Sequence, residues 1–101
     1  MERFQKGLET MKDYVTADAL KQMVESDALA DIAPDLRKMI VEFAYGDIYS
    51  RDGLGKKKRA LVVITAVVTQ GAAPQTKTHI TRGLHAGLTP EEIVEALLQM
   101  V

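Results

Sequence analysis

Residues 74–101 constrain the fold more than any other stretch, because they predict two helices joined at a glycine. Gly87 suits the left-handed conformation in which helices commonly end. Thr89 can then cap a second helix, with Pro90 at its first position and Glu92 three residues after the cap, as in a capping box. This second helix carries a broad apolar stripe that must face other helices. The stripe consists of Ile93, Val94, Leu97, Leu98 and Val101.

Helical spacing of apolar residues also predicts helices in the first half of the chain. One covers about residues 2–13, a second is capped by Thr16, and a third begins at Pro34. The limits of the alanine-rich and acidic segment 27–31 stay open. Gly46 and the cluster at 50–53 predict a helix end and then a loop over residues 45–55. The third helix has the cleanest amphipathic pattern in this half, formed by Leu36, Met39, Ile40 and Phe43.

Residues 60–68 form an apolar run whose secondary structure the pattern does not decide. Six of these nine residues are β-branched, which suits a buried strand, but a helix that is apolar all round fits equally well. The chain has no second strand-like run, so a lone strand would lack a partner, and this favours a helix. Such a helix must be covered on every side, which implies that subunits share it. Gly71 closes it and Pro74 opens the next helix.

The bulk composition excludes several classes of function. The chain has 101 residues, which we interpret as one domain spanning 1–101. Its 13 basic and 14 acidic residues nearly cancel, so we expect neither nucleic acid nor a membrane as a partner. Without cysteine there are no disulfides, thiolate metal ligands or dithiol chemistry. The N-terminus has no apolar segment typical of a signal peptide, so we expect a cytoplasmic protein.

Two motifs, FAYGDIYSRDGL (43–54) and HITRGLHAGLTPEEI (79–93), give the chain a resemblance to the carboxymuconolactone decarboxylase family. The resemblance covers about residue 36 to the C-terminus. It implies an all-α subunit, an alkylhydroperoxidase-like bundle of about five to six helices with a core αα-hairpin made from the last helices. It also implies a homo-oligomer, either a trimer or a hexamer, and a helix rather than a strand at residues 60–68.

The superfamily contains two chemistries, and the sequence bears on both. The alkylhydroperoxidase-like branch uses a Cys-x-x-Cys pair, at whose positions this chain has Ala72 and Gln75. Peroxidase and disulfide reductase activity are therefore disfavoured. The other branch resembles an enzyme of aromatic catabolism that removes a carboxylate from a carboxylated muconolactone without a cofactor. The resemblance thus implies a carboxy-lyase acting on a small anionic substrate.

Within this resemblance, His79 matches the family histidine and is our candidate for moving the proton, because an imidazole can titrate near neutrality. Arg51 and Arg59 are candidates for holding the substrate carboxylates. Tyr45 and Tyr49 can supply hydroxyl donors to the lactone oxygen. No metal site is expected, since His85 lies about 240° around the helix from His79 and the two do not share a face.

Each of these residues also has a structural interpretation. His79 can be a packed core histidine, and the two tyrosines can simply fill the end of the core. Arg51 beside Asp52 can be a loop ion pair of little energetic weight. Glu42, the last candidate for substrate binding, can be an exposed helix residue or an acid lining a pocket.

The sequence departs from the family pattern in three ways. Tryptophan is absent around the two tyrosines, and Gly55 stands where an acidic residue commonly starts the apolar helix, which leaves three lysines at a helix N-terminus. Family members also commonly continue past Val101 with another helix, whose absence would expose part of the 93–101 stripe unless another subunit covers it. These departures support a second hypothesis, a non-enzymatic oligomeric scaffold or a small-ligand-binding module.

Overall fold

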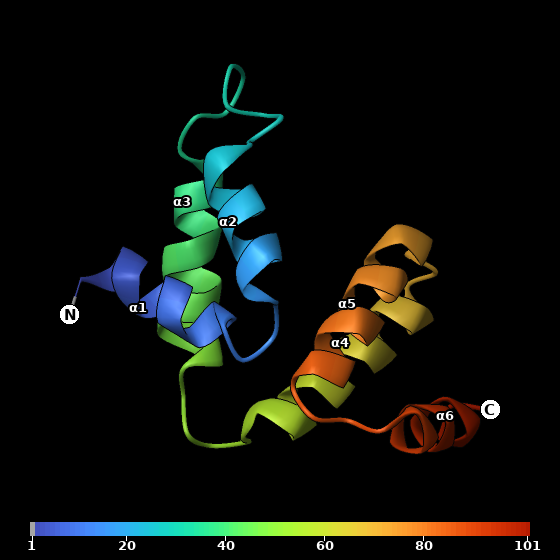
Figure 1. Ribbon diagram of the computed structural model, residues 1–101. Coiled ribbons are helices and arrows are strands. Elements are labelled where there is room, and N and C mark those ends of the chain that lie inside the picture. The colour runs from blue at the N-terminus through green and yellow to red at the C-terminus, as the bar shows by residue number, and fades with distance from the viewer. Residues whose placement is uncertain (1) are drawn as a thin grey trace. The chain divides into compact units, whose positions relative to one another are not determined.

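A computed structural model describes residues 2–101, and these residues form helices and turns without a strand (Figure 1). The all-α prediction is confirmed. Contacts along the chain divide it into two compact units, one ending at Asp52 and one starting at Gly53, and each is described by itself. The interpretation as a single domain stays a prediction. In chain order the elements are α1 (Arg3–Met11), α2 (Ala17–Glu25), α3 (Leu36–Met39), the π-helix η1 (Ile40–Tyr49), α4 (Lys56–Thr69), α5 (Ala73–His85) and α6 (Pro90–Gln99).

The first unit is built on a close approach of α1 to η1, made possible by two glycines. A Cβ added at Gly46 would lie 2.9 Å from the backbone oxygen of Arg3, and one added at Gly7 would lie 2.7 Å from Cγ1 of Val41. Both glycines and Val41 are buried. Gly46 was predicted to punctuate the chain, and this prediction was wrong, because the residue lies inside a helix where it lets two backbones meet.

The contact between α1 and η1 also overturns the expected orientation of the third helix. The four residues of its predicted apolar stripe are all exposed, from 40% for Leu36 to 61% for Met39. The buried residues of η1 are instead Val41, Tyr45 and Gly46. The glycine pair turns that face toward α1, because only there can the two backbones come so close. The helix also begins at Leu36, two residues later than the predicted start at Pro34.

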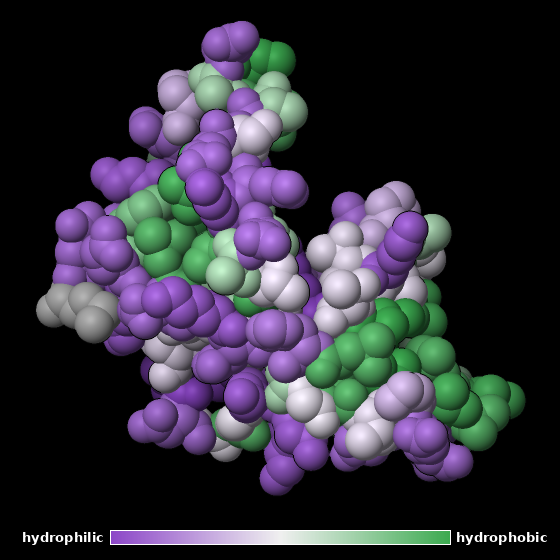
Figure 2. All heavy atoms as spheres, viewed as in Figure 1, coloured by the Kyte–Doolittle hydropathy of each residue, from purple (hydrophilic) through white to green (hydrophobic). Residues whose placement is uncertain are grey.

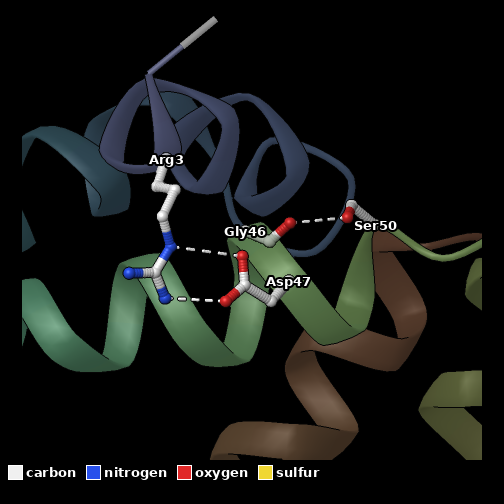
Figure 3. A network of polar contacts seen from close by, with 4 residues as sticks. All are labelled: Arg3, Gly46, Asp47 and Ser50. Atoms are coloured by element: carbon white, nitrogen blue, oxygen red, sulfur yellow. Dashed lines mark hydrogen bonds and ion pairs between the residues drawn. The ribbon is translucent and has the colours of Figure 1, made fainter.

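Polar contacts tie the same two helices together at the surface (Figure 3). The guanidinium of Arg3 donates to both carboxylate oxygens of Asp47, at 2.6 and 3.4 Å. Ser50 donates to the carbonyl of Gly46 at 2.6 Å, which closes the last turn of η1. Both members of the ion pair are solvent-exposed, so the pair orients α1 more than it stabilises the unit.

The connection between α2 and α3 contains the segment whose limits the sequence left open. Thr16 caps α2 as predicted, accepting a hydrogen bond from the backbone nitrogen of Ala19. The helix ends at Glu25, and turns follow. Arg37 fastens this connection, since its guanidinium donates to the carbonyl of Met23 and lies 3.6 Å from the carboxylate of Asp27.

The second unit is organised around a hairpin of α4 and α5. Residues 60–68 lie in α4, so the helix favoured by the sequence is confirmed. Gly71, at φ 71°, closes the turn to α5, and this short connection makes the two helices antiparallel. A Cβ added at Gly83 of α5 would lie 2.9 Å from Cδ1 of Ile64 and 3.7 Å from Cβ of Ala60. Gly83 therefore fits between the two buried residues of α4.

The last helix starts as the sequence predicts. Gly87 has φ 110°, and Thr89 and Glu92 form the reciprocal capping box at the N-terminus of α6. Ile93 is buried, but Val94 and Leu98 of the same stripe are more than half exposed. Figure 2 shows apolar side chains gathered on the surface of this unit. Within residues 2–101, none of the helices combines the length and the apolarity needed to cross a membrane.

We predict that Gly7→Ala destabilises the first unit by about 1–3 kcal/mol, because the new methyl group overlaps the backbone and side chain of Val41. In an open helix the same change would stabilise, by up to about 1 kcal/mol. Urea unfolding measures the difference. The control is Gly53→Ala, where nothing lies within 4 Å of the added carbon. Equal unfolding midpoints for the two variants would contradict the packing described here.

Candidate functional site

The candidate residues fall into two sets, and the first is a tyrosine cluster in the first unit. The rings of Tyr45 and Tyr49, both on η1, have centroids 4.4 Å apart. Tyr14 packs edge-on against both, at 6.2 Å from Tyr45 and 5.1 Å from Tyr49. The side chains of Tyr14 and Tyr45 are 3% and 4% exposed, whereas Tyr49 is half-buried. Tyr45 therefore fits the packing interpretation, and Tyr49 is the member that a ligand can reach.

Tyr14 is a member of this cluster that the sequence did not reveal. It lies in the turn after α1, where its backbone nitrogen donates to the carbonyl of Met11. A single aromatic residue outside a helix carries no periodic signal, so the pattern gave no reason to place it beside the two tyrosines of η1. The cluster is thus a local core, open to solvent at Tyr49.

Glu42 and Arg51 lie on the same part of the chain as the tyrosines. Glu42 is half-buried on the first turn of η1. Arg51 is exposed and lies two residues after the end of the helix, with its backbone nitrogen donating to the carbonyl of Ile48. The π-helical turns of η1 thus carry three of the candidates, and Arg51 follows at their end.

The second set lies on the hairpin of the second unit and is centred on His79. His79 lies on α5 one turn before Gly83, so it shares the face of α5 that packs on α4. It is half-buried there. Since the helices are antiparallel, His79 is level with the C-terminal half of α4, where residues 60–69 contain no titratable side chain.

Arg59 lies toward the other end of the hairpin. It is half-buried on the first turn of α4, beside Ala60. Because Gly83 lies level with the space between Ala60 and Ile64, the rise per residue of a helix places the backbones of Arg59 and His79 about 10 Å apart along the axis. Arg59 and His79 therefore lie on the same hairpin but at different positions along its axis.

Arg82 is the cation that lies on the same side of α5 as His79, and the sequence pattern did not reveal it. It follows His79 by three residues, a spacing that makes two side chains neighbours on a helix, and it is half-buried as well. Burial lowers the pKa of His79 below its usual value, and the positive charge of Arg82 lowers it further. The imidazole is therefore mostly neutral at pH 7.

The signal that would have revealed this environment is the distribution of charge. Residues 53–90 contain no aspartate or glutamate, although the whole chain has nearly equal numbers of acids and bases. The first 52 residues hold 11 of the 14 acidic residues, so the near-zero net charge hides a basic hairpin. Its cationic residues are Lys56, Lys57, Lys58, Arg59, Lys77 and Arg82.

One ion pair connects this basic hairpin to α6. Lys57 lies 4.0 Å from the carboxylate of Glu92, which also accepts the backbone hydrogen bond of the capping box. That hydrogen bond and the charge of Lys57 lower the pKa of Glu92. Glu92 thus offsets part of the unfavourable placement of lysines at the N-terminus of α4, which carries no acidic residue in its first turn.

The second set can bind an anion and exchange a proton. An imidazole that is neutral at pH 7 can accept a proton, and cations on the same hairpin favour a negatively charged ligand. Among residues 2–101 there is no group of three or more His, Asp or Glu side chains that could hold a metal ion. The chemistry that these residues support by themselves is proton transfer to or from a bound anion.

Comparison with known proteins gives the family context for this arrangement. The 4-carboxymuconolactone decarboxylase of Acinetobacter baylyi is 28% identical over 97 residues, which cover 96% of this chain and 71% of that protein. The nitrosuccinic acid decarboxylase npaB of Metarhizium robertsii is 29% identical over 94% of this chain and 65% of its own length. An uncharacterized 15.0 kDa protein of Paracoccus denitrificans is 35% identical over 75 residues, or 56% of its length.

The chain thus spans between 56% and 71% of the length of these three relatives. The sequence profile of the carboxymuconolactone decarboxylase family matches residues 34–101, which include η1, the hairpin with His79, and α6. The match covers about two thirds of the chain. The protein therefore belongs to the carboxymuconolactone decarboxylase family.

Proposed function

We propose that this protein is a cofactor-independent carboxy-lyase that acts on a small carboxylated lactone or a related dicarboxylic acid, with His79 moving the proton. The observation that carries the proposal is the half-buried His79 within a hairpin that has six cationic and no acidic side chains. Two relatives named as decarboxylases, each similar over more than nine tenths of this chain, support the reaction class.

The names of these two relatives define a substrate class. One acts on 4-carboxymuconolactone and the other on nitrosuccinic acid. Both compounds carry two carboxylates and an electron-withdrawing group, a lactone in one case and a nitro group in the other. Such a group accepts the electron pair that remains when carbon dioxide leaves. We expect this protein to act on a compound that shares these two features.

The reaction requires one proton for each molecule of carbon dioxide released. The bond between the carboxylate and the neighbouring carbon breaks, and its electron pair moves into the lactone or nitro group. The imidazolium of His79 then donates its proton to the resulting anion and returns to neutral imidazole. Water restores the proton to His79. No electron acceptor or donor is needed, because the carbon skeleton keeps the electron pair.

The low pKa of His79 makes proton uptake depend on the substrate. In the free protein a charged imidazole is disfavoured by burial and by the charge of Arg82. A dianionic substrate beside the imidazole reverses the local charge and favours the imidazolium. Binding of the anion thereby favours formation of the proton donor.

The remaining candidates have binding roles in this proposal. Arg51 and Arg59 are proposed to hold carboxylates, and Tyr49 to donate a hydrogen bond to the lactone oxygen. Tyr45 is proposed to support Tyr49 through their ring contact, and Glu42 stays a candidate for substrate binding. The alternative, an oligomeric scaffold without chemistry, predicts no turnover of either substrate.

We also propose that the protein assembles into a homo-oligomer, a trimer or a hexamer. The support is that apolar faces remain uncovered within one chain, in both units. Met39 and Phe43 are 61% and 60% exposed in the first unit, and Val62 and Leu98 are 56% and 59% exposed in the second. Faces of this kind commonly mark surfaces where proteins associate.

Replacing His79 with alanine tests the proposed reaction. We predict that His79→Ala lowers the rate of carbon dioxide release from 4-carboxymuconolactone or nitrosuccinic acid by about 10²- to 10⁴-fold, since the proton transfer loses its catalyst. His85→Ala is the matched control, because this exposed residue lies at the end of the same helix. Full activity in His79→Ala would refute the assignment, and an inactive wild type with both substrates would favour the scaffold.

The lowered pKa of His79 also predicts a pH dependence of stability. The unfolded state has an ordinary histidine with a pKa of about 6.5, so it binds more protons than the folded state as pH falls toward 5. The free energy of unfolding contributed by His79 is therefore present above about pH 6.5 and is lost below it. We predict that His79→Gln loses less stability than the wild type between pH 8 and pH 5.5, as measured by urea unfolding. His85→Gln is the control, and identical pH slopes for wild type and His79→Gln would contradict the burial of this imidazole.

Sedimentation velocity tests the oligomer. We predict that the wild type sediments well above the 11.1 kDa of one chain, and that Phe43→Ser shifts it toward the monomer because it removes an exposed aromatic ring from the apolar face. Ile32→Ser is a control at a more exposed apolar residue, which is 85% exposed. A wild type of 11.1 kDa at micromolar concentration would overturn the proposal.

A further inference from the structure

We propose that Arg82 is a substrate-binding residue, which holds the carboxylate that the substrate keeps while the departing carboxylate lies beside His79. This inference rests on the proposed function and specifies its substrate, a small molecule with two carboxylates separated by a few carbon atoms. Nothing in the family likeness singles out this residue, and its support comes from the hairpin itself.

Arg82 lies where it can reach the same ligand as His79. His79 and Arg82 are three residues apart on α5, so their Cβ atoms are about 5–6 Å apart and their side chains are neighbours on the helix surface. Both are half-buried, which means that each is partly shielded from water. By contrast, Arg59 is offset by about 10 Å along the hairpin axis. Arg82 is therefore the arginine that can reach an anion already in contact with His79.

The charged residues near His79 on α5 and α4 favour an anionic ligand. The other titratable residues of α5 are Lys77, Arg82 and His85, and none of them is acidic. On the packed helix α4 the titratable residues are cations confined to residues 56–59, and the part level with His79 has none. The nearest acids along the chain are on α6, starting at Glu91. The imidazole and the guanidinium are thus neighbours on a helix in a segment without acidic residues, and the positive charge of this segment favours a dianionic ligand.

The guanidinium of Arg82 can also orient the carboxylate that it binds. A guanidinium can donate two parallel hydrogen bonds to one carboxylate, which fixes the direction of that carboxylate as well as its position. A substrate held in this way has its second carboxylate a few ångströms away, over the neighbouring imidazole. A lysine could supply charge at the same place but could not fix the direction, so the identity of the residue matters.

A structural role for Arg82 makes a different prediction. Arg82 lies in the last turn of α5, where a cation interacts favourably with the helix dipole. If that were its only role, replacing it with lysine would preserve its effect, and replacing it with glutamine would change stability without changing ligand selectivity. Ligand binding by the folded protein therefore separates the two roles.

The test uses succinate, a non-reacting dicarboxylate, and propionate, its monocarboxylate counterpart. NMR of the imidazole C–H signals follows His79, which is assigned with the His85→Gln variant. In the wild type we expect succinate to raise the pKa of His79, because the dianion neutralises its surroundings. In Arg82→Gln we expect succinate to bind roughly 10- to 100-fold more weakly, the loss typical of a hydrogen bond to a charged group. Arg82→Lys should recover only part of this loss, and propionate should bind weakly to every variant.

The matched control is Lys77→Gln, which removes one positive charge from the same helix. Lys77 is exposed and lies about 200° around α5 from His79, so this variant should lose much less succinate affinity than Arg82→Gln. Equal succinate affinity in Arg82→Gln and the wild type would overturn the proposal, and so would equal losses in Arg82→Gln and Lys77→Gln. An absence of any succinate effect on His79 in the wild type would overturn it too.

The outcome for Arg82 is independent of turnover. If the wild type binds succinate through Arg82 but releases no carbon dioxide from either named substrate, the decarboxylase proposal fails while the dicarboxylate site stands. If the wild type is an active decarboxylase and Arg82→Gln keeps its succinate affinity and its KM, the activity stands and Arg82 is only a helix-terminal cation. Thermal unfolding of each variant confirms that binding is measured on folded protein.

Discussion

The close packing of α5 on α4 is the contact on which the proposed site depends. Gly83 fits between Ala60 and Ile64, and any side chain at position 83 would meet Cδ1 of Ile64 and Cδ1 of Leu88 at about 3 Å. This approach leaves His79, one turn away, at the edge of the helix contact, where it is half-buried rather than exposed. Its partial removal from water lowers the pKa, and the charge of Arg82 on the same helix lowers it further. The packing of this unit thus contributes to the acid–base chemistry of His79.

Much of the fold could be predicted because the signals that begin and end its helices are local in the sequence. The cap at Thr16, the capping box of Thr89 and Glu92, and the positive φ of Gly87 depend on neighbours within a few residues. The exposed stripe of the third helix could not be predicted in the same way. The orientation of this helix depends on the contact between Gly7 and Val41, residues 34 positions apart. From the sequence alone, a glycine in a helical pattern predicts a helix end, because the residue that it packs against is not known.

The candidate site was predictable in part, and for related reasons. A family motif identified His79, and the spacing of the two tyrosines on η1 put their rings in contact. Arg82 and Tyr14 were not found, since one lies in a segment whose charge is hidden by whole-chain neutrality and the other lies in a turn. A charge count by segment, instead of one over the whole chain, would have drawn attention to residues 53–90.

The separation of charge along the chain has a further consequence for the proposed reaction. A histidine surrounded by carboxylates would stay protonated at neutral pH. Those carboxylates would repel a bound dianion. In the acid-free hairpin the opposite holds, because the free imidazole loses its proton and each negative charge on a ligand is attracted to the hairpin. Ligand binding and protonation therefore favour each other, which suits a reaction that consumes one proton per turnover. The absence of acids from residues 53–90 thus contributes to this coupling together with His79.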